Sequence, residues 1–183
     1  TGVQTCALPI SCQPPSAENF TGRVSEYFDE ALAPVRALSV RFEQVTAHMA
    51  QAAGESSGDE REYDALLAEM TARDVWSLDS RIDEVLAGLG LAMLAGEGRE
   101  RDVATLSPGQ RGRLPLAAML IARPEALILD EPTNHLDAEG LAFLARTVRQ
   151  WEGPVLMSSH DRAFIEDTAT AIYDLDVATW QAL

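Results

Sequence analysis

Residues 127–132 read LILDEP, three apolar residues followed by two carboxylates and a proline. A short apolar run of this kind is typical of a buried strand in a parallel sheet. Such sheets bind ligands at the carboxyl ends of their strands, where Asp130 and Glu131 would lie. One carboxylate there can hold Mg²⁺ through water, and the next can orient a water molecule toward a phosphate. Taken alone, such a pair is weak evidence, since a strand that ends in a solvated turn is the more common explanation.

The residues that follow predict more α/β structure. Apolar patterning indicates a helix over 138–150, a strand over 154–159, a short helix over 162–167 and a strand over 171–176. Strands that alternate with helices predict a parallel α/β sheet. The second strand leads into His160, so we expect this imidazole at the same sheet edge as Glu131. There it could hydrogen-bond a terminal phosphate.

Residues 106–110 read LSPGQ and predict the start of a helix. Ser107 is a good N-cap, Pro108 suits the first helical position, and Gly109 lets a ligand approach the backbone. The free N–H groups and the positive end of the helix dipole at such a start attract anions. We also expect a local kink at Pro115, since a proline inside a helix removes a backbone hydrogen bond.

Residues 23–90 carry apolar side chains at helical spacing, which predicts a helical subdomain. Pro34 is expected to kink or divide the first helix, and the polar run 54–60 to separate it from the next. We interpret the apolar stripes as packing surfaces without chemistry.

The 183 residues are 46% apolar and 23% charged, the composition of a soluble globular protein. No apolar run approaches the ~18 residues that a membrane-spanning helix needs. A formal net charge of −15 disfavours non-specific nucleic-acid binding by the chain alone, and no sequence-specific DNA binding is expected. All 14 basic residues are arginine, so chemistry that requires a lysine of this chain is excluded.

The first ten residues, TGVQTCALPI, carry no charge and make a poor secretory signal. Codons for this decapeptide can spell a widely used sequencing-library adapter. We therefore expect residues 1–10 to be an artefact and the true polypeptide to begin near Ser11.

Three motifs together resemble the ATP-binding cassette (ABC) superfamily: LSPGQ at 106–110, LILDEPTNHLD at 127–137 and SHDRAF at 159–164. They correspond to the signature loop, the Walker B motif with the D-loop, and the H-loop, in the usual order. The NHLD and SHDR segments resemble the ABC-F subfamily, soluble twin-cassette proteins that act on ribosomes. The resemblance implies an α/β P-loop NTPase fold, with a parallel sheet core and a helical subdomain.

The resemblance also implies a role for each matching residue. Asp130 would bind Mg²⁺, Glu131 would position the hydrolytic water, and His160 would sense the terminal phosphate of ATP. Gln13 resembles the Q-loop glutamine, which would contact both nucleotide and metal, whereas His135 is expected to be structural. The other implied nucleotide-binding positions, which serve the site shared with a partner cassette, are Ser107, Gly109, Gln110 and Asp137.

The implied domains are a Q-loop region (11–22), a helical subdomain (23–105), and a signature helix with the α/β ATPase core (106–183). The resemblance implies a cytoplasmic parent protein that hydrolyses ATP with Mg²⁺ and has a second cassette and the ribosome as partners. The family's Walker A phosphate loop needs a lysine. We expect that loop upstream of these residues and expect the chain alone to be inactive.

Two other functions stay open. The chain could be the ATP-binding subunit of an ABC transporter, or a non-catalytic module that binds nucleotide or a partner. Within the ABC-F interpretation, translation control and protection from ribosome-targeting antibiotics both fit, and the cassette could be either of the two. The charge of −15 is awkward for a ribosome-binding protein.

Overall fold

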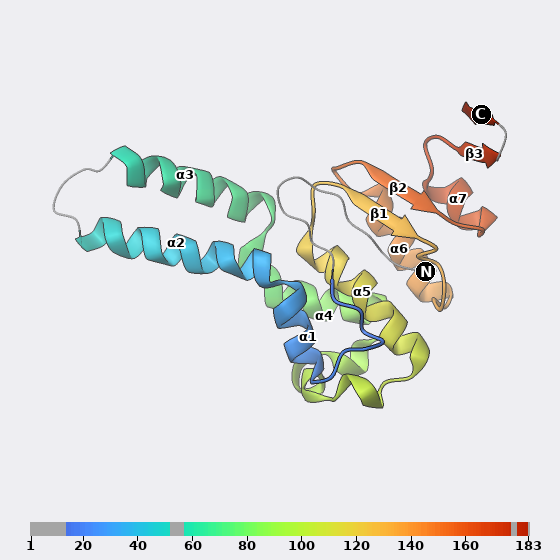
Figure 1. Ribbon diagram of the computed structural model, residues 1–183, viewed down its shortest axis with the longest axis horizontal. Helices are drawn as coiled ribbons and strands as arrows, with labels where there is room; N and C mark the ends of the chain where they lie inside the picture. The colour runs from blue at the N-terminus through green and yellow to red at the C-terminus, as the bar shows by residue number, and fades with distance from the viewer. Residues whose placement is uncertain (1–13, 52–56, 177–178, 183) are drawn as a thin grey trace.

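The computed structural model describes residues 14–51, 57–176 and 179–182 (Figure 1). Its helices are α1 (Val24–Ala31), α2 (Ala33–Gln51), α3 (Ser57–Ala72), α4 (Leu78–Gly88), α5 (Pro108–Ala122), α6 (Ala138–Arg149) and α7 (Arg162–Thr168). Its strands are β1 (Leu127–Asp130), β2 (Val155–Ser158), β3 (Tyr173–Asp176) and β4 (Thr179–Ala182). Short 3₁₀ turns lie at Val75–Ser77, Ala92–Leu94, Gly96–Glu100 and Val103–Thr105.

The first helical stretch divides where the sequence predicts. The helix α1 ends at Ala31 and α2 begins at Ala33, so Pro34 occupies the second position of α2. Proline is tolerated there because the first-turn N–H groups have no intrahelical acceptor. The polar break expected over 54–60 is shorter than predicted, since α3 already begins at Ser57. The serine and acidic residues of this segment suit the first turn of a helix.

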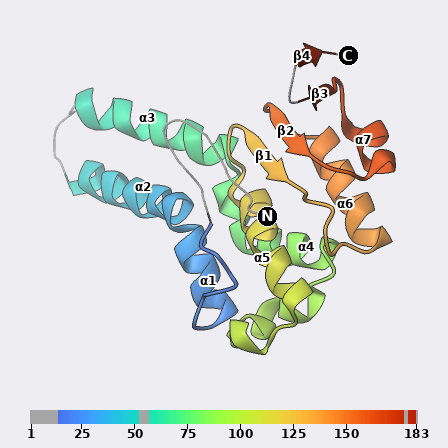
Figure 2. The same cartoon turned by 45° about the vertical axis from the view of Figure 1, so that its right-hand side comes forward.

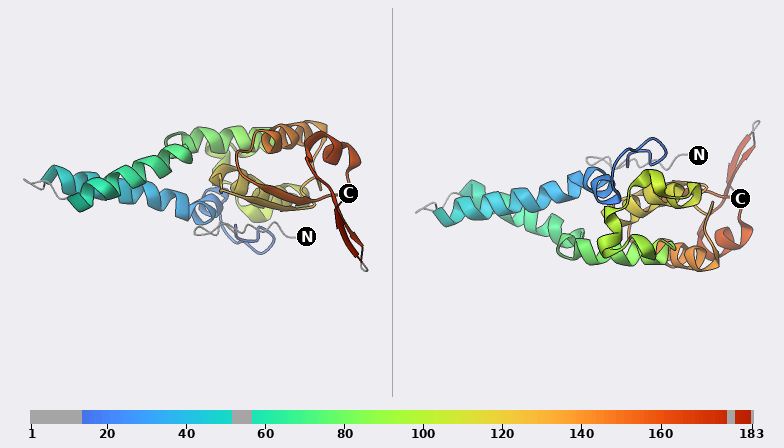
Figure 3. Two further views of the ribbon diagram at one scale, coloured as in Figure 1. Left: turned by 90° about the horizontal axis from the view of Figure 1, so that it is seen from above. Right: turned by 90° about the horizontal axis from the view of Figure 1, so that it is seen from below.

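The helices α2 and α3 pack side by side and extend together away from the rest of the chain (Figures 1 and 3). An ion pair joins Arg41 to Glu62 at 2.6 Å, and Nδ1 of His48 lies 3.0 Å from Oδ2 of Asp59. Halfway along α2 the ring of Phe42 lies 5.1 Å from that of Tyr63. These contacts are mostly exposed, so we expect each to contribute little stability by itself.

The hydrophobic core lies among α1, α4 and α5. The side chains of Tyr27, Phe28 and Ile82 are almost completely buried there. Every residue of α5 from Leu114 to Ala122 is buried except Pro115, as expected for a helix that is apolar on all sides. The helix continues through Pro115 without interruption, and a local kink there stays a prediction.

The strands β1 and β2 pair in parallel, which confirms the predicted parallel sheet. Leu127 pairs with Val155 and Asp130 with Ser158, so the two strands end level with each other. Leu127 and Leu129 are buried, and α6 and α7 lie beside the strand pair (Figure 2). This register puts whatever follows Asp130 and Ser158 at one sheet edge.

The expectation of a third strand in the same parallel sheet is wrong. The strand β3 forms where predicted, but it pairs with β4 in an antiparallel register, Asp176 opposite Thr179. Only two residues separate β3 from β4, so closing this local pair costs little chain entropy. In the described segments, none of the helices is both long and apolar enough to cross a membrane.

Candidate active site

The ends of β1 and β2 bring two carboxylates and a hydroxyl group together. The Oγ atom of Ser158 donates a hydrogen bond to Oδ1 of Asp130 at 2.6 Å. The backbone N–H of Glu131 donates to the carbonyl oxygen of Ser158 at 3.0 Å, and the Glu131 nitrogen lies 3.2 Å from the Ser158 Oγ. The hydrogen bonds between β1 and β2 thus continue one residue past the end of β1 and fix the backbone at Glu131.

Glu131 and His160 are in direct contact. The Nδ1 atom of His160 lies 2.7 Å from Oε2 of Glu131, and the side-chain exposures are 76% and 25%. Glu131 has a φ of 48°, in the left-handed region that residues with a Cβ rarely adopt. A strained backbone conformation persists only where the surrounding structure holds it in place. Such residues are found preferentially at functional sites.

Hydroxyl groups make hydrogen bonds on both sides of His160 in the chain. The Oγ1 atom of Thr133 lies 3.3 Å from Oγ of Ser159, which accepts a hydrogen bond from the N–H of Asp161. Asp161 in turn caps α7 by accepting from the N–H of Phe164 at 3.0 Å. Ser158 and Ser159 were not among the site residues predicted from sequence. The signal that could have found them is two hydroxyl residues ending an apolar strand that neighbours the carboxylate strand.

The start of α5 is built as predicted. Ser107 caps the helix, since its Oγ accepts a hydrogen bond from the N–H of Gln110 at 3.3 Å. The Gln110 side chain returns the contact, with Oε1 accepting from the Ser107 N–H at 2.9 Å. Gly109 lies in the first turn. Among the described residues, no hydrogen bond links these three positions to Asp130, Glu131 or His160, so they form a region separate from the carboxylate edge.

The segment after Glu131 runs from the carboxylate edge to α5. His135 has a φ of 66°, and a methyl group at Gly112 would lie 3.5 Å from its Cδ2 atom. His135 therefore packs on the first turns of α5. Asp137, exposed, caps α6 by accepting a hydrogen bond from the N–H of Gly140 at 2.8 Å.

Gln13 lies outside the described residues. The segment that follows it packs on α1, where the Tyr27 hydroxyl donates to the carbonyl oxygen of Pro15 at 2.9 Å. Burial and the charge of Glu30 raise the pKa of Tyr27, so this hydroxyl is protonated and available as a donor.

The carboxylate edge offers few protein ligands for a metal ion. No group of three or more metal-ligating side chains occurs among the described residues. Mg²⁺ bound with a nucleotide needs no such group, because waters and phosphate oxygens fill most of its coordination sphere. Asp130, exposed at the strand end, can supply the one carboxylate that such a site uses.

Comparison with known proteins decides the family. The family model described as ABC transporter matches residues 29–134, more than half of the chain. The chain belongs to the ATP-binding cassette family. Its motifs and relatives place it in the ABC-F subfamily. The predicted fold class is thereby confirmed as that of a P-loop NTPase cassette, here with a small parallel sheet and a large helical part.

Several curated relatives resemble this cassette along most of its length. It is 36% identical over 159 residues to the tylosin resistance ATP-binding protein TlrC of Streptomyces fradiae, covering 84% of the chain and 28% of TlrC. It is 32% identical over 166 residues to the energy-dependent translational throttle protein EttA of Mycobacterium tuberculosis, covering 90% of the chain and 28% of EttA. It is 31% identical over 160 residues to the ATP-binding protein Uup of Haemophilus influenzae, covering 86% of the chain and 23% of Uup. The chain thus spans about a quarter of the length of these relatives.

Proposed function

We propose that this chain is the ATP-binding and ATP-hydrolysing cassette of an ABC-F protein that acts on the ribosome. The observation that carries the proposal is the cluster of Asp130, Glu131 and His160 at one sheet edge, with Glu131 2.7 Å from His160. The reaction is ATP + H₂O → ADP + phosphate.

In this proposal Glu131 orients the attacking water. Its carboxylate lies at the end of the sheet where a terminal phosphate would bind, and it can accept a hydrogen bond from water. His160 is mostly exposed and can turn a ring N–H toward the phosphate oxygens. Asp130 would hold Mg²⁺, which neutralises phosphate charge when bound. The Ser158 hydroxyl keeps the Asp130 carboxylate in place.

A second cassette would complete the site. Ser107 and Asp137 are exposed, and the start of α5 presents backbone N–H groups that can bind the phosphates of a nucleotide held by a partner. We assign Gly109 and Gln110 to the same contact, and Gln13 to the nucleotide and metal of this cassette. The hydrogen bond from the Ser107 backbone N–H to the Gln110 side chain would fix the conformation of the helix start for that ligand.

The ribosome is proposed as the partner because relatives are named as a translational throttle protein and a tylosin resistance protein. Protection from an antibiotic and control of translation remain the two forms of this function. The net charge of −15 requires that contacts with RNA come from local groups of arginine or from other parts of the protein.

The test is co-sedimentation of the full-length protein that carries this cassette with ribosomes, in ATP and in ADP. We expect more protein on ribosomes with ATP. A protein that sediments with membranes in an ATP-dependent way, and not with ribosomes, would instead identify the ATPase of a transporter.

A further inference from the structure

A cleft of about 1010 Å³ lies at the sheet edge opposite Asp130 and Glu131. Its walls come from α3, α4, the end of α5, α6 and the segments that precede β1 and β2. We call it the amino-edge cleft. Four arginines line it, Arg73, Arg81, Arg123 and Arg146, out of 14 basic residues in the chain. The volume is at the upper end of the range of small-molecule sites.

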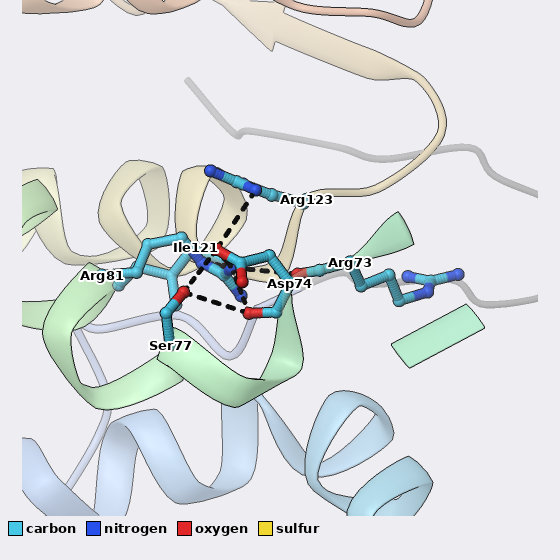
Figure 4. Close-up of polar contacts among 6 residues, drawn as sticks. All are labelled: Arg73, Asp74, Ser77, Arg81, Ile121 and Arg123. Atoms are coloured by element: carbon cyan, nitrogen blue, oxygen red, sulfur yellow. Dashed lines mark hydrogen bonds and ion pairs between the residues drawn. The ribbon is translucent and has the colours of Figure 1, made fainter. Parts of the chain in front are cut away.

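Two of these arginines are buried. The exposures of Arg73 and Arg81 are 7% and 5%, and they are the buried polar or charged residues of the described part. Arg81 donates to the carbonyl oxygens of Ile121, Arg73 and Asp74, each at 2.9 Å (Figure 4). Arg81 therefore ties the end of α5 to the turn between α3 and α4.

Each buried guanidinium keeps one nitrogen without a partner. NH1 of Arg73 and NH2 of Arg81 have no hydrogen-bond acceptor within the described segments. Arg73 extends away from the Asp74 carboxylate, and its Nε bonds to Glu69 at 3.2 Å (Figure 4). A buried donor without an acceptor is costly, and more so when it is charged. Both nitrogens lie below the cleft surface, so an anion would reach them after rotation of the side chain. A third such nitrogen, Nε of Arg99, lies outside the cleft.

The acidic residues of the cleft are more accessible than the two buried cations. Glu84, Glu125 and Glu152 are exposed and Glu69 is half-buried. Asp74 is shared, since its Oδ2 lies 3.6 Å from NH1 of both Arg81 and Arg123. Charges in contact with water are well screened, whereas buried charges are not. The buried guanidinium groups, paired with Glu69 and Asp74, thus lie on the inner side of the cleft, and the exposed carboxylates lie at its rim.

Arg81 stays charged despite its burial. Burial, together with the positive charge of Arg123, lowers the pKa of Arg81 to about 10, and the neighbouring carboxylates partly offset this. At neutral pH the guanidinium remains protonated. The lowered pKa agrees with a cation whose environment still lacks negative charge.

We propose that the amino-edge cleft binds the phosphate group of a nucleotide unit, either free or within RNA, through Arg73 and Arg81. The planar N–H groups of guanidinium match phosphate oxygens, with Arg123 and Arg146 as outer cations. Trp151 also lines the cleft and is half-buried, which gives a base an aromatic surface. The neighbouring ring of Phe143 is covered by the guanidinium of Arg146, 5.7 Å from the ring centroid. The rim carboxylates can accept from sugar hydroxyl or base amino groups. None of the ATP-site residues lines this cleft, so the proposal does not depend on the proposed function.

The test measures binding of three probes to the 183-residue chain at low salt, by calorimetry: inorganic phosphate, AMP and a 5′-phosphorylated oligouridylate. Arg73→Gln should weaken binding at least about tenfold, since it removes a buried charged donor. Arg146→Ala should weaken it several-fold. Arg149→Ala is the matched control on the same helix, because Arg149 pairs with Asp167 and does not line the cleft. Circular dichroism verifies that each variant is folded.

The three probes identify the source of the phosphate. Binding of AMP and of the oligouridylate indicates a nucleotide unit, and binding of the oligouridylate alone indicates RNA. Glu152→Gln, on the rim, should tighten binding by removing a negative charge. The proposal is overturned if no probe binds, if only inorganic phosphate binds, or if Arg146→Ala and Arg149→Ala weaken binding equally.

Discussion

The imidazole Nδ1 of His160 contacts the Glu131 carboxylate although the two residues are 29 positions apart. The contact exists because β1 and β2 run parallel and end level at Asp130 and Ser158. The left-handed backbone of Glu131 and the exposed loop at His160 then close the gap. A carboxylate and an imidazole held at one sheet edge can act on the same terminal phosphate.

Replacing Glu131 by glutamine tests the proposed hydrolytic role. Glutamine keeps the shape but orients and activates water poorly, so ATP turnover of the full-length protein should fall ~10²–10⁴-fold. Nucleotide binding should survive because Asp130 is intact, and the protein should stay on ribosomes in ATP. Turnover is measured as released phosphate, together with co-sedimentation. Unchanged turnover would remove Glu131 from this role.

Asp130→Asn is the companion variant. It alters the residue proposed to hold Mg²⁺, so it should weaken Mg²⁺-dependent ATP binding itself rather than trap the bound state. Titration of a fluorescent ATP analogue at several Mg²⁺ concentrations separates the two variants. If both variants bind Mg²⁺ and ATP equally well, the division of labour between the two carboxylates is wrong.

The 183-residue chain by itself should hydrolyse ATP no faster than a buffer blank. Phosphoryl transfer in P-loop enzymes relies on a lysine at the β- and γ-phosphates, and all 14 basic residues here are arginine. The assay is phosphate release by the purified chain with Mg²⁺, with its Glu131→Gln variant as control. Turnover that this variant abolishes would show that the chain needs no such lysine.

Ser107→Ala should lower the free energy of unfolding by about 1 kcal/mol, because α5 loses its N-cap. Ser80→Ala is the matched control. Ser80 is exposed in the first turn of α4, where Ser77 and not Ser80 is the N-cap, so this change should be close to neutral. Urea unfolding followed by circular dichroism measures both. Equal effects would mean that the cap contributes nothing.

Two glycines should respond in opposite ways to alanine. A Cβ at Gly153 would lie 1.8 Å from the backbone oxygen of Glu125, so Gly153→Ala must displace the chain and should cost about 1–3 kcal/mol of stability. At Gly112, inside α5, the nearest atom would be 3.5 Å away. Gly112→Ala should therefore gain about 0.5–1 kcal/mol. Thermal unfolding decides, and a stabilising Gly153→Ala would contradict the packing described here.

Much of the fold and of the carboxylate site could be predicted from sequence, because the signals are local. Ser107 and Pro108 mark a helix start by their own chemistry, and the apolar run 127–129 specifies a buried strand. Because parallel strands end at the same sheet edge, the two predicted strands are enough to predict that Glu131 and His160 lie near each other.

The parts that were missed depend on strand pairing, packing and backbone geometry that local sequence patterns do not specify. The pairing of β3 with β4 competes with pairing to the parallel strands, and alternation of apolar residues does not decide between them. Arg73 and Arg81 look like surface residues in the sequence, because only packing of α3, α4 and α5 buries them. The left-handed backbone at Glu131 has no sequence marker, since the residue there is not glycine.

The paired helices α2 and α3 have the shape of a lever arm (Figure 1). The 19 residues of α2 span about 28 Å, so a rotation of ~10° at the base would move the far end by ~5 Å. The fulcrum is the turn at Asp74, which is fastened to α4 and to the end of α5 through Arg81 and Arg123. Small displacements in the cassette would thus be amplified at the tip, and small forces applied at the tip would return to the cassette as torque.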